Sequence, residues 1–197
     1  MQKQLLIASN NADKVIEFRG LLQGSGWEVL APSDLGLSVD VEETGTTYSE
    51  NARIKAEAFC EASMLPALAD DSGLEVDALH GEPGALHHLN GWDGTNQAER
   101  IQILLAALKD ASPDERKGRY KAVLYVAFPD GSFLEEDGAC EGVIIHEPTG
   151  VNGFGYDPVF FLPDLGITMA ELPTEEKNRI SHRAVAAHKL VPRLRLL

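Results

Sequence analysis

The sequence predicts an α/β fold: a mixed, twisted sheet flanked by helices, with an active-site cleft, in one domain spanning residues 1–197. In the first half of the chain, short apolar runs alternate with segments of helical spacing, which is the pattern of strands joined by helices. In the second half, strand-like runs follow one another directly, and the turn Pro129-Asp130-Gly131 joins the first two, as in a meander. We therefore expect functional side chains at the junctions between strands and helices.

Each expected element has its own signal in the sequence. The apolar run at residues 4–8 predicts a buried strand, and residues 14–23 carry apolar side chains at helical intervals. Thr47-Tyr48-Ser49-Glu50 has the form of a capping box and predicts the start of the next helix. The last helix is expected to break at Ile180-Ser181. The remaining expected strands are 27–30, 65–69, 119–128, 133–140, 142–146 and 158–162, and the remaining expected helices are 97–108 and 174–190.

Composition excludes several classes of protein. The chain has 31 acidic and 17 basic residues, a formal charge of −14, which argues against a wide basic surface for nucleic acid but leaves small anionic substrates open. Cys60 and Cys140 are too few for a disulfide framework, so a reducing cytoplasm is expected. No apolar stretch approaches the roughly 20 residues that a membrane span requires. We therefore expect a cytoplasmic protein with neither nucleic-acid nor membrane partners.

The first junction between a strand and a helix is a candidate phosphate site. It carries Ser9, Asn10, Asn11, Ala12, Asp13 and Lys14. Backbone N–H groups and the helix dipole favour an anion at such a junction. The alternative is a plain Asn cap beside an exposed lysine. The segment lacks the Gly-x-x-x-x-Gly-Lys pattern of a Walker loop.

Acidic pairs at two places suit a metal ion. Asp70-Asp71 directly follows an apolar strand, and successive side chains of an extended chain point in opposite directions, so one carboxylate can face the cleft while the other supports the fold. A second carboxylate from Glu42-Glu43 would complete an oxygen-rich site for Mg²⁺, which takes one or two carboxylates together with substrate phosphates. The alternatives are solvated acidic turns, or a glycosidase pair, which the neighbouring lysines fit badly.

Two further segments suit recognition of a nucleotide base. In Gly153-Phe154-Gly155-Tyr156-Asp157-Pro158, two glycines allow close backbone approach, and Phe154 or Tyr156 offers a stacking face. The alternative is a glycine-rich turn before a buried strand. Lys177, His182 and Arg183 supply donors that suit a keto oxygen and not an amino group. Their alternative is a solvated helix start.

Three histidines and one cysteine could suggest a zinc site or a catalytic nucleophile, but their positions in the sequence do not favour either. His80, His87 and His88 lack the spacing of a zinc site. Cys60 lies between Phe59 and Ala62, which predicts a packing role and not a nucleophile.

Taken together, these segments resemble the inosine triphosphate pyrophosphatase family, and within it the bacterial dITP/XTP pyrophosphatase branch. The resemblance spans nearly the whole chain. It rests on five ordered matches: Ser9-x-Asn11-x-x-Lys14; Glu43-Thr44-Gly45 with Glu50-Asn51-Ala52 and Lys55; Ala69-Asp70-Asp71-Ser72-Gly73-Leu74; Gly153-Phe154-Gly155-Tyr156-Asp157-Pro158; and Glu176-Lys177 with Ser181-His182-Arg183.

The resemblance implies an inosine-triphosphatase-like fold and a homodimeric, cytoplasmic, Mg²⁺-dependent enzyme. Such an enzyme would split dITP, ITP, XTP and dXTP into monophosphate and pyrophosphate, removing them from the nucleotide pool. It implies that Asp71 is the proton acceptor and, with Glu43, a metal ligand. The substrate contacts that it implies are Ser9, Asn10, Asn11, Ala12, Asp13, Lys14, Lys55, Ser72, Phe154, Gly155, Tyr156, Asp157, Lys177, His182 and Arg183.

Two positions depart from the family pattern. Asp13 stands where glycine is common, and residues 85–91 lack the arginine of the usual Ser-Ala-Arg-aromatic run. The second departure is the one feature that favours a rival hypothesis, a non-catalytic protein that binds or senses purine nucleotides. A third reading, an acidic interaction module, would have to explain all five matches.

Overall fold

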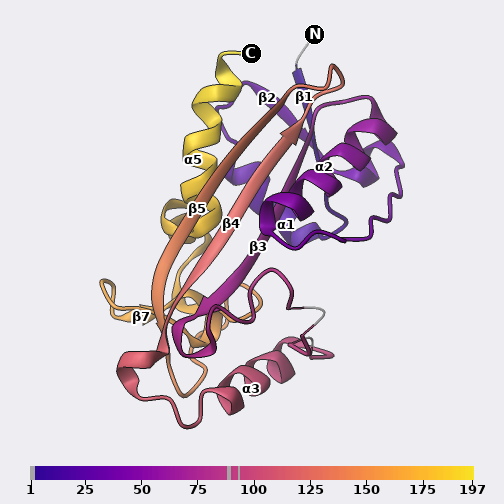
Figure 1. Cartoon of the computed structure of the whole chain (residues 1–197). Coiled ribbons are helices and arrows are strands. Elements are labelled where there is room, and N and C mark those ends of the chain that lie inside the picture. The colour runs from indigo at the N-terminus through magenta and orange to yellow at the C-terminus, as the bar shows by residue number, and fades with distance from the viewer. Residues whose placement is uncertain (1–2, 88–89, 93) are drawn as a thin grey trace. The chain divides into compact units, whose positions relative to one another are not determined.

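The computed structural model describes residues 3–87, 90–92 and 94–197, and in this part of the chain seven strands form one mixed sheet (Figure 1). The strand order is β2-β1-β3-β4-β5-β6-β7. β1 pairs in parallel with β2 and β3, whereas β6 pairs in antiparallel fashion with β5 and β7. The strands are β1 Lys3–Ile7, β2 Trp27–Leu30, β3 Ala67–Val76, β4 Lys117–Ala127, β5 Phe133–Ile144, β6 Phe160–Leu162 and β7 Ile167–Thr168.

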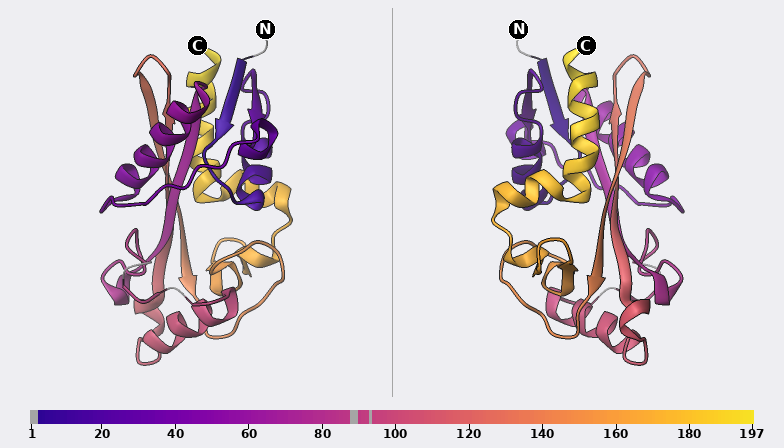
Figure 2. Two further views of the ribbon diagram at one scale, coloured as in Figure 1. Left: turned by 90° about the vertical axis from the view of Figure 1, so that its right-hand side faces the viewer. Right: turned by 90° about the vertical axis from the view of Figure 1, so that its left-hand side faces the viewer.

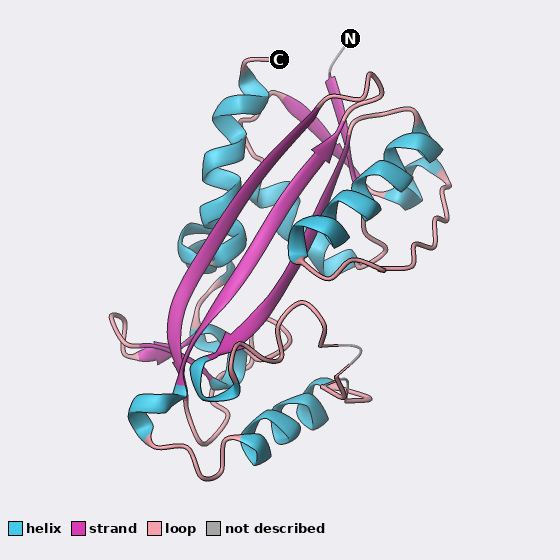
Figure 3. Cartoon of the chain, in the orientation of Figure 1, coloured by secondary structure: helices cyan, strands magenta, loops and turns pink. Residues whose placement is uncertain are grey.

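Helices connect the strands of the first half, as the alternating pattern predicts, and the α/β class with a mixed sheet is confirmed (Figure 3). The α-helices are α1 Ala12–Leu21, α2 Tyr48–Ser63, α3 Gln97–Ala107, α4 Thr174–Ile180 and α5 His182–Arg195. None of the helices that the structure describes is long and apolar enough to cross a membrane.

The chain groups into two compact units, and its long strands pass from one unit to the other. Unit 1 comprises Met1–Asp71, Ala122–Gly138 and His182–Leu197, and unit 2 comprises Ser72–Lys121 and Ala139–Ser181. The prediction of one domain is not tested by this grouping and stays a prediction.

In unit 1, strand β1 is buried on both faces, with helices against each (Figure 2). Leu5 and Ile7 pack in one apolar cluster with α1 and α5, whereas Leu6 and Ala8 pack in another with α2. This is the period of two that an extended chain imposes. The neighbouring strand β3 has the same two faces, so its polar side chains point either toward α1 and α5 or toward α2.

In unit 2, the core gathers around α3, β6 and the ends of the long strands. Arg116 is 2% exposed in this unit, and it donates to the backbone carbonyls of Ile144 and Leu108 at 2.7 and 2.8 Å. Through these donors, the buried guanidinium joins the end of α3 to the end of β5.

Three elements differ from the sequence prediction. β3 does not end before Asp70 but continues through Asp71, Ser72 and Gly73 to Val76. Residues 133–140 and 142–146, predicted as two strands, form the single strand β5, which ends at Ile144. The two-residue strand β7 was not predicted, because two residues carry no periodic signal. The predicted helix break is confirmed, since α4 ends at Ile180 and α5 begins at His182.

Candidate active site

The two neighbouring carboxylates of β3 face opposite sides of the sheet, and this explains their different surroundings. Leu68 packs in the cluster of α1 and α5, whereas Ala69 packs in the cluster of α2. Alternation therefore turns Asp70 toward α1 and α5 and Asp71 toward α2. The contacts agree, since Asp70 binds side chains of α1 and α5 and Asp71 binds a side chain of α2. The expectation that the two carboxylates point in opposite directions is confirmed.

Asp70 is the centre of a buried charge network. Its Oδ2 lies 2.9 Å from Lys14 Nζ and 3.0 Å from Arg183 Nε, and its side chain is 1% exposed. Burial raises the pKa of Asp70, but the attraction of Arg183 and Lys14 outweighs it and holds the pKa well below its usual range. Arg183 also reaches Glu17 Oε2 at 3.4 Å. Asp70 is thus a permanent anion that holds two cations in place.

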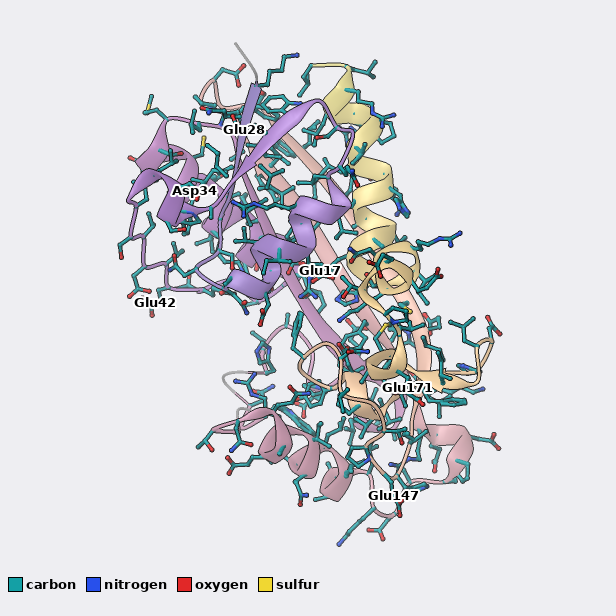
Figure 4. The ribbon with its side chains drawn as sticks, turned by 180° about the vertical axis from the view of Figure 1, so that it is seen from behind. Glu17, Glu28, Asp34, Glu42, Glu147 and Glu171 are labelled. Atoms are coloured by element: carbon teal, nitrogen blue, oxygen red, sulfur yellow. The ribbon has the colours of Figure 1, made fainter. Side chains whose placement is uncertain are left out.

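Glu17, on α1 (Figure 4), is a member of this network that sequence reasoning missed. It is only 7% exposed, although a glutamate in a helix is normally solvated. Its spacing of three residues from Lys14 puts both on one face of α1 and was the available signal. Arg183, predicted to read a base, therefore lies buried between Asp70 and Glu17 in unit 1.

The loop between β1 and α1 is held by its own side chains. Asn11 is the N-cap of α1, and its Oδ1 accepts from the backbone N–H groups of Asp13 and Lys14 at 2.9 and 3.4 Å. Ser9 Oγ accepts from the backbone of Asn11 at 3.2 Å. A cavity of about 350 Å³ has Ser9, Asn10 and Ala12 in its wall. The alternative interpretation was a plain Asn cap beside an exposed lysine. The Asn cap is present, but Lys14 is paired with Asp70 and is not a free surface lysine.

On the other side of β3, two carboxylates share one ammonium group. Lys55 Nζ on α2 lies 2.9 Å from Asp71 Oδ1 and 3.1 Å from Glu43 Oε2. Burial, opposed by Lys55 and reinforced by Glu43 and Asp70, raises the pKa of Asp71 to about 6. Burial disfavours the charge of Lys55, yet the attraction of Asp71 and Glu43 outweighs it and raises the pKa of this lysine. The group has a fixed cation and a carboxylate that titrates near neutrality.

This carboxylate pair has the donor chemistry that Mg²⁺ requires. The described residues contain no group of three or more His, Cys, Asp and Glu side chains placed to hold a metal. Two carboxylates are nevertheless sufficient for Mg²⁺, which keeps several waters and takes further oxygens from substrate phosphates. Asp71 and Glu43 both lie within about 3 Å of one positive charge, Lys55 Nζ, so their oxygens already converge on a cation. Glu42 lies exposed on the outside of the loop (Figure 4), which favours Glu43 as the second ligand.

In unit 2, the predicted glycine-rich segment forms a second polar cluster. Asp157 Oδ2 accepts from Lys177 Nζ at 2.6 Å and from the backbone N–H of Phe154 at 3.0 Å, and Asp157 is 3% exposed. Lys177 Nζ also lies 4.8 Å from the centroid of the Phe154 ring. Gly153 has a φ of +75°, and a Cβ there would collide with Asp157 Oδ2. Glycine is therefore required for Asp157 to fold back onto the Phe154 backbone.

The structure brings the predicted residues together in groups that lie within single units. In unit 1 one group contains Lys14, Asp70 and Arg183, and the other contains Glu43, Lys55 and Asp71. His182 is the first residue of α5 and is 4% exposed. In unit 2, Ser72, Gly155 and Tyr156 are half-buried. His88 and Leu89, in the loop that departs from the family pattern, lie outside the described residues, while His87 Nδ1 lies 3.3 Å from the carbonyl of Gly84.

The sequence matches a family and many curated proteins along most of its length. The model of the Ham1 family matches residues 5–193. A protein of Geobacillus kaustophilus named dITP/XTP pyrophosphatase is 46% identical over 188 residues, which cover 95% of this chain and 92% of that protein. One of Methylococcus capsulatus with the same name is 45% identical and covers 100% of this chain and 98% of its own.

Solved structures agree with the fold. A HAM1 protein from Coxiella burnetii has a TM-score of 0.88 and 38% identity, covering 99% of this chain and all of its own. The Ham1 protein of Staphylococcus aureus has a TM-score of 0.84 and 38% identity, covering 98% of each chain. The resemblance drawn from the five motifs is confirmed. The chain belongs to the Ham1 family.

Proposed function

We propose that this chain is a nucleoside triphosphate pyrophosphatase that splits dITP, ITP, XTP and dXTP into the monophosphate and pyrophosphate. The observation that carries the proposal is the cluster of Asp71, Glu43 and Lys55, two converging carboxylates and a fixed ammonium in a protein of strongly acidic composition. The relatives named dITP/XTP pyrophosphatase support this substrate class. Cytoplasmic location and a homodimeric state belong to the same proposal.

The triphosphate would meet cations supplied by separate parts of the chain. Residues 9–14 at the start of α1, with Lys55 and Lys177, would contact phosphate oxygens. Asp71 and Glu43 would hold Mg²⁺, which supplies neutralisation of phosphate charge and polarisation of the phosphoryl group. A few placed cations are sufficient, so no basic surface is needed.

Asp71 would act as the base. In the metal-free chain the pKa of Asp71 is raised to about 6, mainly by burial, so Asp71 is mostly ionised at pH 7 to 8 and is a stronger base than an exposed carboxylate. As the oxygen of a water molecule bonds to the α-phosphorus, its proton passes to Asp71. The bond from the α-phosphorus to the bridging oxygen breaks, and pyrophosphate leaves with that electron pair.

The groups predicted to contact the base would select keto purines. Phe154 would stack on the ring, with Gly155 and Tyr156 beside it and Ser72 in contact with the substrate. Asp157, His182 and Arg183 would face the polar edge of the base, and Arg183 would do so while its Nε and Nη1 stay bound to Asp70 and Glu17. Donors at the 6-position suit the oxygen of hypoxanthine and xanthine and leave the amino group of adenine unmatched.

Product identity tests this function. The protein is incubated with ITP, XTP or ATP, with and without Mg²⁺, and the products are separated by ion exchange. We expect monophosphate and pyrophosphate from ITP and XTP only with Mg²⁺, and at least tenfold slower turnover of ATP. Release of inorganic phosphate, or equal rates on ATP, would overturn the proposal. Tight binding of ITP without product would instead favour a nucleotide-binding protein without turnover.

A further inference from the structure

Helices α2 and α3 begin with the same local arrangement, although one belongs to unit 1 and the other to unit 2. At α2, the backbone N–H and Oγ1 of Thr46 donate to Glu50 Oε2 at 2.7 and 2.9 Å. At α3, the same two groups of Thr95 donate to Glu99 Oε2 at 2.7 and 2.5 Å. These bonds satisfy polar groups at a helix start and are a general device of helix capping. They assign no special role to either helix.

The N-termini of α2 and α3 differ at the residue that follows the capping glutamate, Glu50 or Glu99. At α2 this residue is Asn51, which is 0% exposed and accepts through Oδ1 from the backbone N–H of Gly45 at 2.8 Å. At α3 it is the half-buried Arg100, whose Nε donates to the carbonyl of Gly94 at 3.3 Å. Only the start of α2 therefore depends on a fully buried amide.

Asn51 is a poor choice for stability alone. Its Nδ2 is buried and has no hydrogen-bond partner among the residues that the structure describes. A buried donor left in this state costs about 1–3 kcal/mol, whereas an apolar side chain of similar volume carries no such cost. Gly45 is only half-buried, so its N–H could donate to water if Asn51 were replaced. The contact between Asn51 and Gly45 therefore serves something other than folding.

The contact fixes the loop that carries Glu43. Gly45 lies two residues after Glu43, and Asn51 lies one helical turn before Lys55 on the same face of α2. A Cβ at Gly45 would meet Asn51 Oδ1 at 2.6 Å and the Asn51 backbone nitrogen at 2.9 Å, so the approach is close enough to require glycine. Loop and helix are thus locked together beside the position where Glu43 Oε2 meets Lys55 Nζ at 3.1 Å.

We propose that Asn51 is a positioning residue, which with Gly45 holds Glu43 where its carboxylate and that of Asp71 can bind one divalent cation. The inference rests on the proposed function, because it assigns these two carboxylates to the metal. It adds a residue that itself touches neither metal nor substrate. Residues that orient metal ligands change metal affinity by roughly 10- to 100-fold.

The test measures the affinity of the full-length, nucleotide-free protein for Mn²⁺. Binding is monitored through the relaxation rate of water protons. We expect Asn51→Leu to raise the Kd for Mn²⁺ by about tenfold or more, with an unfolding temperature equal to or above that of the parent chain. Gly45→Ala should raise the Kd similarly, and the double variant should add little, because both changes break the same contact. If Asn51→Leu does not fold, Gly45→Ala carries the same test.

Gly94→Ala is the matched control. A Cβ there would meet the backbone nitrogen of Arg100 at 2.6 Å, so it strains the start of α3 as Gly45→Ala strains that of α2. It should lower the unfolding temperature and leave Mn²⁺ binding unchanged. Unaltered Mn²⁺ affinity in Asn51→Leu and Gly45→Ala would overturn the inference and leave the proposed function standing. No Mn²⁺ binding by the parent chain would overturn the inference together with the assignment of Asp71 and Glu43 to the metal, whereas the products formed from ITP decide the proposed function separately.

Discussion

Two buried pairs of lysine and aspartate, one in each unit, show how the same two side chains acquire different properties. In unit 1, Lys55 Nζ lies 2.9 Å from Asp71 Oδ1 and 3.1 Å from a second carboxylate oxygen, Glu43 Oε2. In unit 2, Lys177 binds Asp157 at 2.6 Å and has the ring of Phe154 at 4.8 Å. The third member of each group makes the difference. A second carboxylate suits binding a cation and moving a proton, whereas an aromatic ring suits holding a flat ligand.

The aspartates differ in the same way. Burial raises the pKa of Asp71 to about 6, and Glu43 adds to the shift, so this carboxylate can exchange its proton or bind a metal. Asp157 instead accepts from both Lys177 Nζ and the Phe154 backbone, which makes it the support of its group. The comparison therefore predicts a loss of chemistry from changes in unit 1 and a loss of stability or substrate affinity from changes in unit 2.

The largest effect is expected from Asp71→Asn. The change removes the proposed base and one metal ligand, so kcat on ITP should fall by about 10²- to 10⁴-fold. The unfolding temperature should change little, because Lys55 keeps Glu43 as a partner. Steady-state kinetics with thermal unfolding on the same preparation measure both. Retained turnover would move the base to another residue.

Asp157→Asn should lower the stability of the protein and change kcat much less than Asp71→Asn does. It leaves the ammonium of Lys177 buried without its counter-ion, and loss of one partner of a buried pair costs about 3–5 kcal/mol in the free energy of unfolding. Urea unfolding followed by circular dichroism gives this quantity for Asp157→Asn and Asp71→Asn side by side. Equal losses in the two variants would remove the distinction between the two pairs.

Phe154→Ala should weaken binding and spare the chemistry. Stacking on an aromatic side chain contributes about 1–3 kcal/mol per base, so the KM for ITP should rise by roughly 10- to 100-fold with kcat nearly unchanged. Phe133→Ala is a suitable control, since Phe133 stacks on Tyr125 in unit 1 and is 57% exposed. A fall in kcat with constant KM would assign Phe154 to the chemical step.

The smallest effect is a pH dependence of metal affinity. The raised pKa of Asp71 means that a proton competes with the cation as the pH falls through about 6. Mn²⁺ affinity should be constant above pH 7 and drop by about tenfold per pH unit below 6. The same titration of Glu43→Gln should show weaker binding with a lower midpoint, because one of the charges that raise the pKa of Asp71 is gone. A midpoint near 4 in the parent chain would contradict this account of Asp71.

Sequence reasoning predicted the local features of this site and missed those that depend on distant contacts. Alternation along a strand was sufficient to turn Asp70 and Asp71 to opposite sides. The predicted strand ended at residue 69, where the apolar run stops, yet the sheet keeps Ser72 and Gly73, residue types that favour turns, within β3. The spacing of Glu17 from Lys14 hinted at a shared face of α1, but the pairing of Glu17 with Arg183 could not be predicted, because the two residues are 166 positions apart in the sequence. For the same reason, the burial of Arg183 against Asp70 was not visible.

The central claim is that water attacks the α-phosphorus and that pyrophosphate leaves. Hydrolysis of ITP in water enriched in ¹⁸O, with both products analysed by mass spectrometry, tests it most directly. The account predicts one heavy oxygen in inosine monophosphate and none in pyrophosphate, with the label lost along with turnover in Asp71→Asn. Heavy oxygen in pyrophosphate would place the attack at the β-phosphorus and contradict the proposed mechanism.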